Sequence, residues 1–320
     1  MGITADAARF LVHARQRGVR FDSVLTLGRQ QVSVSPGRLV RLLRDGGCWP
    51  PPEGEAAFVS ALARTSWRFE PFARALGAKR VDACDASAYE GAAVVHDLNS
   101  PIPEAWAERY DVVLDGGTLE HVFNFPVAIA NCMRWVKPGG HLILITPANN
   151  QCGHGFYQFS PELFYRVLGA ENGFEILRMV ALCDAGGVSR WLGVTYVFPI
   201  TSPWYEVSDP ARIHSRVTML NSKPVMLFVL ARKNNTTVLF QRSPQQSDYL
   251  ELWASDSPAN PLGQSNAGER LVKWLTARLP EGLWRDVLPR LLALADPCRL
   301  RRFRRRHSFA NRTCYRRVRE

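Results

Sequence analysis

The chain alternates short apolar runs with segments whose apolar positions fall at helical spacing. Continuous apolar runs of this length are typical of buried parallel strands, and apolar residues at i, i+3, i+4 and i+7 share one face of a helix. Strands that alternate with helices predict an α/β fold with a mainly parallel sheet. The expected strands are 21–28, 80–84, 92–96, 111–114, 142–145, 174–181 and 224–231.

Helix start and stop signals lie between these runs. Thr4 is the expected N-cap of a helix that ends at Gly18. Residues 124–135 carry a second helical pattern, which Pro138-Gly139-Gly140 is expected to end before the next strand. Ser160-Pro161-Glu162 combines an N-cap, a proline in the first turn and an acid near the positive end of the helix dipole, so a third helix is expected there.

A long insertion follows the first expected strand. Residues 29–80, 52 in all, separate Gly28 from Val81 of the next expected strand, whereas a parallel crossover needs only about a dozen residues. The insertion is either a surface elaboration or a cover over a ligand site, and the sequence favours neither. The chain after Gly28 also lacks the further glycines of a G-x-G-x-x-G loop, which makes a nicotinamide dehydrogenase the least favoured function.

Acidic residues follow three of the expected strands. Asp85, Asp97 and Asp115 each come directly after a short apolar run. Ligands of open α/β sheets bind beyond the carboxyl ends of the strands, so the three carboxylates are expected to line one crevice. Asp also favours turns at strand ends, and Asp82 would take the place of Asp85 if the second strand ended earlier.

Five segments of the chain, taken in order, resemble the class I S-adenosylmethionine-dependent methyltransferases. They are VLTLG (24–28), CDAS (84–87), HDLN (96–99), YDVVLDGGTLEHV (110–122) and WVKPGGHLILITP (135–147). The resemblance covers residues 21–232. It implies a doubly wound, mostly parallel seven-stranded sheet with an insertion after the first strand and a helical, basic C-terminal extension. It also implies S-adenosylmethionine as the cofactor.

The same resemblance implies roles for the residues at the strand ends. Leu27-Gly28-Arg29 would approach the methionine moiety, Asp85 the ribose hydroxyls, Asp97-Leu98 the adenine, and Asp115-Gly116-Gly117 the methionine end. An ionised carboxylate accepts strong hydrogen bonds from hydroxyls, and glycine lets the backbone approach a ligand closely. The chain departs from the family at Thr26, where an acid is usual, and Arg29 is expected to face either the cofactor's carboxylate or solvent.

Three residues are candidates for chemistry on the acceptor side. His121 is the first candidate for a general base, because the unperturbed pKa of histidine lies near neutrality, although in the family this position often serves the fold or the cofactor pocket. His154 and Tyr157 lie at 153–162, where an acceptor would enter, unless the aromatic residues there only pack the loop down. No metal site is predicted, since Cys152 and His154 lack a second ligand pair at zinc-like spacing.

Positive charge is concentrated at the C-terminus. Residues 299–320 hold ten Arg and one Glu, so +9 of the net charge of +11 lies there. We expect a methyltransferase-like α/β domain at 1–233, a linker and C-terminal helices at 234–298, and an Arg-rich tail at 299–320. The cysteine spacing does not indicate disulfides, and neither an apolar signal region nor a membrane-spanning stretch is evident, so a cytoplasmic protein is expected.

These observations favour an enzyme that methylates a small-molecule or glycan-like acceptor, because the nearly neutral domain argues against nucleic acid as the main substrate. One alternative is a catalytically degenerate protein that keeps the fold and acts as an interaction module, as the reduced glycine loop suggests. Another is an RNA methyltransferase whose tail binds nucleic acid or an anionic surface. The sequence leaves the acceptor atom open.

Overall fold

The computed structural model of the chain describes residues 2–51, 53–183, 202–254, 305 and 307–318. The chain forms two compact units. The larger comprises Met1–Val207, Ser222–Pro244 and Arg317–Glu320, and the smaller comprises Ser208–Asn221 and Gln245–Arg316. The predicted boundaries at 233 and 298 stay a prediction, and most of the expected C-terminal helices and the start of the Arg-rich tail lie outside the described residues.

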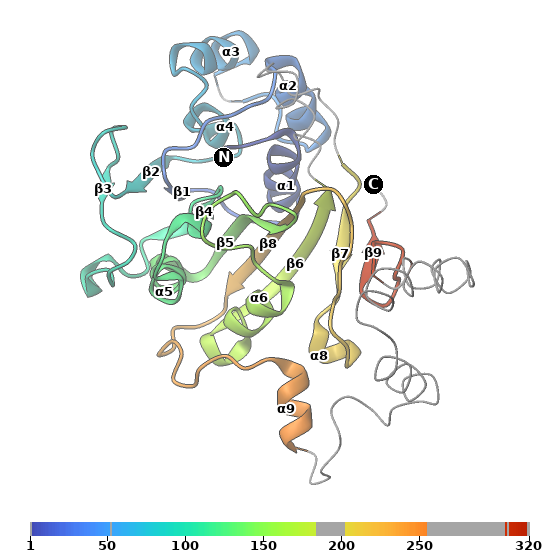
Figure 1. Cartoon of the computed structure of the whole chain (residues 1–320). Helices are drawn as coiled ribbons and strands as arrows, with labels where there is room; N and C mark the ends of the chain where they lie inside the picture. Colours follow the sequence, from blue (N-terminus) through green and yellow to red (C-terminus); the bar gives the residue numbers. More distant parts are fainter. Residues whose placement is uncertain (1, 52, 184–201, 255–304, 306, 319–320) are drawn as a thin grey trace. The chain divides into compact units, whose positions relative to one another are not determined.

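One sheet organises the larger unit (Figure 1). Its strands are β1 (Ser23–Leu27), β2 (Arg80–Asp85), β3 (Val94–Val95), β4 (Tyr110–Asp115), β5 (Val136–Asn149), β6 (Phe174–Cys183), β7 (Tyr205–Val207) and β8 (Val225–Lys233). They lie in the order β3-β2-β1-β4-β5-β8-β6-β7. The pairs from β3 across to β5 are parallel, whereas β8 is antiparallel to both of its neighbours, β5 and β6.

The expected α/β fold with a mostly parallel sheet is confirmed, and each of the seven expected strands forms. The number of strands differs from seven, because the short strands β7 and β9 (Tyr315–Arg317) are added. Neither has the apolar run that predicts a buried strand, and each is three residues long. The third expected strand shortens to the two residues of β3.

One face of the sheet packs against four helices, α1 (Ala5–Gln16), α2 (Pro36–Asp45), α3 (Glu55–Arg64) and α4 (Glu70–Ala75). Alternate strand residues share a side, so Val112 and Leu114 of β4 face the same way. They form one buried cluster with Ile143 of β5, Phe10 of α1 and Phe58 of α3. In Figure 1 the four helices lie above the sheet. The insertion after β1 forms α2 to α4 and is therefore built into the core.

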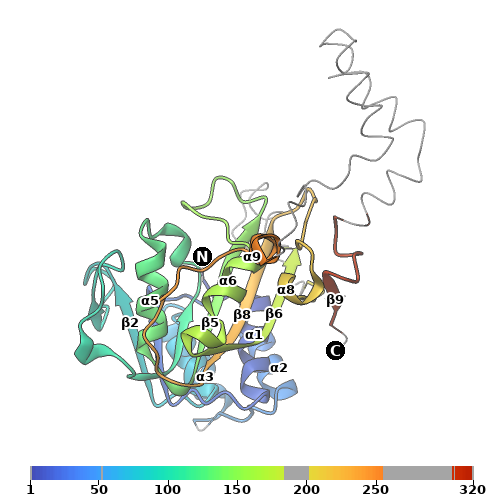
Figure 2. The ribbon, with the colours of Figure 1, turned by 90° about the horizontal axis from the view of Figure 1, so that it is seen from below.

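The opposite face of the sheet is covered by α5 (Phe125–Trp135) and α6 (Pro161–Val167). In Figure 2, which is seen from below, both helices lie in front of the strands. Val113 of β4 and Leu144 of β5 point to this face and are fully buried. Ile129, Cys132 and Met133 of α5 are also almost inaccessible to solvent. The spacing that predicted one buried helix face at 124–135 is confirmed.

Both expected N-caps form, but the end of α5 differs from the expectation. The Oγ1 atom of Thr4 accepts a hydrogen bond from the N–H of Ala7, and Ser160 Oγ accepts one from the N–H of Leu163, each at 3.3 Å.

The helix α5 ends at Trp135, and β5 begins directly at Val136. Pairing with β4 extends this strand: Val136 pairs with Tyr110, and after an irregular stretch the pairing resumes between Val112 and His141. The expected strand at 142–145 was therefore too short.

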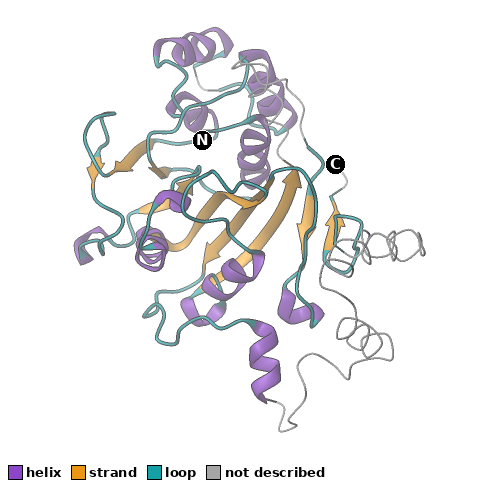
Figure 3. Cartoon of the chain, in the orientation of Figure 1, coloured by secondary structure: helices purple, strands orange, loops and turns teal. Residues whose placement is uncertain are grey.

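The smaller unit contains α8 (Pro210–Ile213) and α9 (Ser247–Ala254), and β9 begins in it (Figure 3). Asp209 caps α8 by accepting a hydrogen bond from the N–H of Ala211 at 3.0 Å. In the larger unit, the 3₁₀ turn η1 (Glu104–Trp106) lies between β3 and β4, and the 3₁₀ turn η3 (Ala170–Asn172) lies between α6 and β6. Among the described helices of both units, none is long and apolar enough to span a membrane.

His13 makes the stability of the fold depend on pH. Burial and the nearby Arg178 lower its pKa from 6.5 to about 4, and its Nε2 atom lies 2.5 Å from the guanidinium of Arg178. Between these two pKa values the unfolded chain binds a proton that the folded chain does not, so stability falls as the pH drops from 6.5 to 4. This group contributes a slope of at most about 1.4 kcal/mol per pH unit.

The variant His13→Gln is expected to lose this part of the slope. Urea unfolding of the wild type and the variant at pH 4.5, 5.5, 6.5 and 7.5 gives the free energy of unfolding of each protein. The difference between the two free energies, followed with pH, measures the contribution of His13, because the titration of the other groups cancels. Equal slopes for His13→Gln and the wild type would contradict the expectation.

Candidate functional site

The carboxyl ends of β1, β2 and β4 lie side by side. In the parallel register, Leu27 of β1 is level with Cys84 of β2 on one side and with Asp115 of β4 on the other. Asp85 follows Cys84 and ends β2. Two of the three strand-end acids therefore lie at one edge of the sheet, where ligands of such folds bind.

The loop after β1 turns at Gly28. This glycine has a φ of +67°, a region that residues with a side chain rarely adopt, and its N–H donates to the carbonyl of Cys84 at 2.7 Å. Thr26, which stands where the family usually has an acid, is buried and donates from Oγ1 to the carbonyl of Gly28 at 2.8 Å. Thr26 therefore fixes the turn that presents Gly28.

Gln30 fills the space between the loops after β1 and β4. Its Nε2 atom donates to the carbonyl of Leu27 at 2.6 Å, and the side chain is buried. A Cβ atom on Gly116 would lie 2.5 Å from Gln30 Oε1, so the two loops approach as closely as only glycine permits. Within the described part of the chain, Gln30 Oε1 is buried and has no hydrogen-bond partner. Sequence reasoning did not select Gln30, because only the fold brings it against Gly116.

Arg29 is held by acidic and carbonyl groups of neighbouring segments. Its Nε atom lies 3.0 Å from Glu70 Oε1, and its Nη1 atom donates to the carbonyl of Glu90 at 2.7 Å. Glu70 belongs to α4, and Glu90 lies in the loop after β2. Arg29 thus joins the insertion to the loop that follows Asp85, and its predicted contact with the cofactor's carboxylate stays a prediction.

Asp85 rather than Asp82 is the acid that the fold presents at the end of β2. Asp82 Oδ2 accepts a hydrogen bond from the hydroxyl of Tyr110 at 2.7 Å and pairs with Arg80, so its carboxylate is occupied. Asp85 is partly exposed, and its carboxylate accepts a long hydrogen bond of 3.4 Å from the N–H of Ser87. The geometry therefore favours Asp85 over Asp82 as a ligand for hydroxyl groups.

Asp97 and Leu98 lie beyond the short strand β3. Asp97 is exposed, and its Oδ1 atom accepts hydrogen bonds from the backbone N–H and the side-chain amide of Asn99, at 2.9 and 2.8 Å. These bonds hold the pKa of Asp97 below its usual value. Leu98 is buried. Asp97 thus caps the turn through one oxygen, and the predicted adenine contact of the pair stays a prediction.

Asp115 organises the loop after β4 from inside the protein. Its carboxylate is inaccessible to solvent, and Oδ1 accepts hydrogen bonds from the N–H groups of Thr118 and Leu119 at 2.8 and 3.3 Å. Burial raises its pKa, against the effect of these bonds. Thr118 Oγ1 donates to the carbonyl of Leu27 at 2.9 Å and ties this loop to the one after β1. Gly116 and Gly117 are buried between them.

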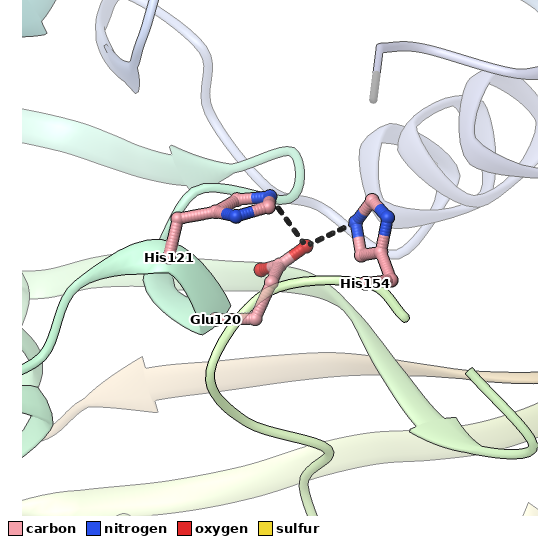
Figure 4. Close-up of side chains that lie close together, drawn as sticks. All are labelled: Glu120, His121 and His154. Carbon is pink, nitrogen blue, oxygen red and sulfur yellow. Dashed lines mark hydrogen bonds and ion pairs between the residues drawn. The ribbon is translucent and has the colours of Figure 1, made fainter. Parts of the chain in front are cut away.

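Glu120 is the centre of a polar cluster that adjoins this loop (Figure 4). It lies in the 3₁₀ turn η2 (Leu119–His121) and is inaccessible to solvent. Its Oε1 atom lies 3.3 Å from Nε2 of His154 and 3.9 Å from Nε2 of His121. Burial, and then the charge of Asp115, raise the pKa of Glu120. His121 is exposed, yet partial burial lowers its pKa.

The loop after β5 brings His154 to this cluster. The carbonyl of Glu120 accepts hydrogen bonds from the N–H groups of Phe156 and Tyr157, at 2.7 and 3.2 Å. Gly155, at a φ of +75°, lies so close that a Cβ atom there would be 2.7 Å from this same carbonyl oxygen. Two segments 34 residues apart in sequence are thereby fixed to each other at Glu120.

Tyr157 holds its loop in place with both ends of its side chain. Its hydroxyl donates to the carbonyl of Phe123 at 2.6 Å, and its ring lies 6.0 Å from that of Phe159 and 6.2 Å from that of Phe125. This geometry suits a positioning residue better than one whose hydroxyl is available to a substrate. Its catalytic role stays a prediction, as do those of His121 and His154.

Comparison with protein families identifies the central part of the chain. Residues 57–144 match the family model described as a methyltransferase domain. The matched segment contains Asp85, Asp97 and Asp115 with the Glu120-His121 pair, and it begins after the loop that follows β1. No curated protein matches the chain.

Solved structures of similar fold share little sequence with the chain. A 1,6-didemethyltoxoflavin-N1-methyltransferase of Burkholderia thailandensis is 14% identical over 72% of this chain and 78% of that one, with a TM-score of 0.34. A putative S-adenosylmethionine-dependent methyltransferase of Listeria monocytogenes is 14% identical over 72% and 99%, with a TM-score of 0.37. The N-methyltransferase NodS of Bradyrhizobium japonicum is 11% identical over 71% and 94%, at 0.34. Likenesses of this strength carry no argument about the substrate.

The family match and the mixed α/β sheet together define the class of protein. Residues 57–144 therefore form a methyltransferase domain, and the sheet that contains them has the fold of the class I S-adenosylmethionine-dependent methyltransferases. This domain marks the protein as a methyltransferase, with S-adenosylmethionine as its cofactor.

Proposed function

We propose that the enzyme methylates a small-molecule or glycan-like acceptor, which binds between the turn at Glu120-His121 and the loop at 153–160. The observation that carries the proposal is the cluster on Glu120, where two histidines from separate segments meet beside the loop after β4. One of them, His121, is exposed and can meet an acceptor from solvent.

The residues at the sheet edge suit S-adenosylmethionine. The partly exposed carboxylate of Asp85 would accept hydrogen bonds from the ribose hydroxyls, as the sequence predicts. The turn at Gly28 lets the backbone approach a ligand. Gln30 Oε1, which among the described residues is buried without a hydrogen-bond partner, would accept a hydrogen bond from the amino group of the cofactor. It would thereby take the role of the acid that the family usually has at the position of Thr26. When bound, the cofactor supplies the methyl group on its sulfonium.

Two exposed aromatic side chains support an acceptor site next to the histidines. Phe123 is 72% exposed and Phe156 is 67% exposed, and their ring centroids lie 6.0 Å apart in an edge-to-face arrangement. One follows His121 by two residues and the other follows His154 by two residues. Aromatic faces pack against apolar rings and the apolar faces of sugars, so the pair fits a small apolar or glycan-like acceptor.

His121 is the residue placed best to accept a proton from the acceptor. Burial lowers its pKa below 6.5, so at neutral pH most of the imidazole is neutral and able to act as a base. Methyl transfer to a hydroxyl or an amine needs the loss of one proton, while the alignment of acceptor and methyl group supplies the rest of the rate enhancement. His154, which contacts Glu120, would position the acceptor beside it.

Titration of the full chain with S-adenosylhomocysteine, followed by calorimetry and thermal shift, tests the cofactor site. We expect saturable binding and a rise in Tm, because a ligand at 100 times its Kd stabilises the folded state by about 2.7 kcal/mol. The absence of binding at millimolar ligand would contradict the proposal and favour a catalytically degenerate protein that keeps the fold.

Binding of nucleic acid by the tail at 299–320 remains a prediction from its charge alone.

A further inference from the structure

The Glu120 cluster has the donor set of a transition-metal site. It offers one carboxylate oxygen and two imidazole nitrogens, from Glu120, His121 and His154, and these atoms all lie within 4.8 Å of one another. Two histidines and one carboxylate are a common ligand set for divalent first-row metals such as zinc, iron, cobalt and manganese. Three protein ligands leave at least one coordination position for another group.

The spacing of the three donors is close to what one ion requires. Ligand atoms about 2.1 Å from the same ion lie at most about 4.2 Å apart. The distances from Glu120 Oε1 to Nε2 of His154 and of His121, 3.3 and 3.9 Å, already satisfy this limit. The widest separation in the cluster, at most 4.8 Å, would close by about 0.6 Å or less, which small side-chain rotations provide.

A second observation at the same place points to a ligand. The side chain of Glu120 is inaccessible to solvent, and among the described residues its Oε2 atom has no hydrogen-bond partner. A buried carboxylate oxygen without a partner is costly, and metal coordination is one of the ways in which proteins satisfy such a group. In Figure 4 both imidazole rings turn a nitrogen toward this carboxylate.

The backbone fixes the cluster before any ion binds. The N–H groups of Phe156 and Tyr157 hold the carbonyl of Glu120, so the loop that carries His154 is tied to the turn that carries His121. His121 follows Glu120 directly in the 3₁₀ turn η2. Ligands held in place by their own chain segments lose little conformational freedom when they coordinate an ion.

We propose that Glu120, His121 and His154 bind one divalent transition-metal ion. This inference deepens the proposed function, on which the role of the ion rests. An open coordination position on the ion would take a hydroxyl oxygen of the acceptor and lower its pKa, so that the proton would pass to solvent water instead of to His121. The oxygen would then form its bond to the methyl carbon as the bond from this carbon to the sulfonium sulfur breaks, which leaves S-adenosylhomocysteine. The exposed side of His121 and the Phe123–Phe156 pair lie where such an acceptor would approach. The site departs from the sequence prediction of no metal, because the fold, and not local spacing, brings the ligands together.

Calorimetric titration of the chelator-treated full chain with zinc chloride, and with cobalt chloride followed by its visible spectrum, tests the site. We expect one ion per chain with a Kd of about 10 μM or below, and a cobalt spectrum that indicates nitrogen and oxygen ligands. Glu120→Gln, His121→Ala and His154→Ala should each weaken binding by at least about 10-fold. Because His121 is exposed, His121→Ala is expected to fold like the wild type, and its Tm checks this.

Two variants control for other metal-binding groups. His214 lies 2.7 Å from Glu251 in the smaller unit, a histidine–carboxylate pair outside the three-residue cluster, so His214→Ala should bind zinc as the wild type does. Cys152, an exposed thiol two residues before His154, should likewise tolerate Cys152→Ser. Binding that survives His121→Ala and His154→Ala, or that only Cys152→Ser removes, overturns the proposal, and so does the absence of binding at 100 μM zinc.

The test separates the metal site from the proposed function. Binding of S-adenosylhomocysteine without binding of zinc would remove the metal inference and leave the methyltransferase proposal intact. Binding of zinc that depends on the three residues, without any affinity for S-adenosylhomocysteine, would instead remove the cofactor proposal and leave the metal site.

Discussion

Replacing Asp85 by Ala is expected to weaken the binding of S-adenosylhomocysteine by about 100-fold. Hydrogen bonds to a charged acceptor contribute about 1.5–3 kcal/mol each, and the loss of two such bonds at a partly exposed carboxylate amounts to roughly 3 kcal/mol. Asp85 ends β2 at the sheet edge where Leu27 and Asp115 meet, and Asp82 is already occupied by Tyr110. Calorimetric titration of the variant beside the wild type measures the change.

Asp22→Asn is the matched control for this prediction. Asp22 precedes β1 and therefore lies at the opposite, amino end of the parallel strands, where it pairs with Lys79 and Arg20. Its replacement should leave the affinity for S-adenosylhomocysteine unchanged. Asp97→Ala tests the predicted adenine contact in the same titration. An affinity of Asp85→Ala within about 3-fold of the wild type would show that the ribose is held elsewhere.

Gly155→Ala is expected to destabilise the protein by about 2 kcal/mol and to detach His154 from Glu120. The φ of +75° at this position costs a residue with a side chain about 1 kcal/mol or more. The added Cβ atom would also lie 2.7 Å from the backbone oxygen of Glu120, which cannot rotate away. The loop must therefore move, and the hydrogen bonds from Phe156 and Tyr157 to Glu120 are lost with it.

Thermal unfolding and amide hydrogen exchange measure these two effects. The Tm should fall by several degrees, and the amides of Phe156 and Tyr157 should exchange faster than in the wild type. Gly153→Ala is a close control two residues away, because a Cβ atom there meets nothing within 4 Å. If both variants exchange alike at Phe156 and Tyr157, the contact between Gly155 and Glu120 does not hold the loop.

The sheet was largely predictable because its signals are local. Each of the seven expected apolar runs forms a strand, and Thr4 and Ser160 cap their helices as expected. The errors lie where pairing between distant segments decides the outcome. The strand β5 extends back to Val136 through Pro138 and the following glycines, because Tyr110 of β4 pairs with Val136. Intrinsic propensity is a weak guide wherever tertiary contacts are available.

The site was predictable only in part. Local sequence placed Asp85 and Asp115 at the carboxyl ends of their strands, and the structure confirms these positions. It gave no reason to select Gln30, which is buried only because Gly116 approaches it. Glu120, which lies beside the selected His121, was given no chemical role, because its burial and its contact with His154 depend on the loop after β5.

The sequence by itself determined the fold class of this protein: the alternation of apolar runs and helical segments sets the α/β sheet, and acids mark the ends of two of its strands. Only the tertiary structure decided which polar groups meet at that edge. It brought Glu120 and His154 together across 34 residues through hydrogen bonds between backbones, and it occupied Asp82 and Arg29 with other partners. The local spacing of residues in the sequence does not predict such contacts, because they depend on which segments the fold places side by side.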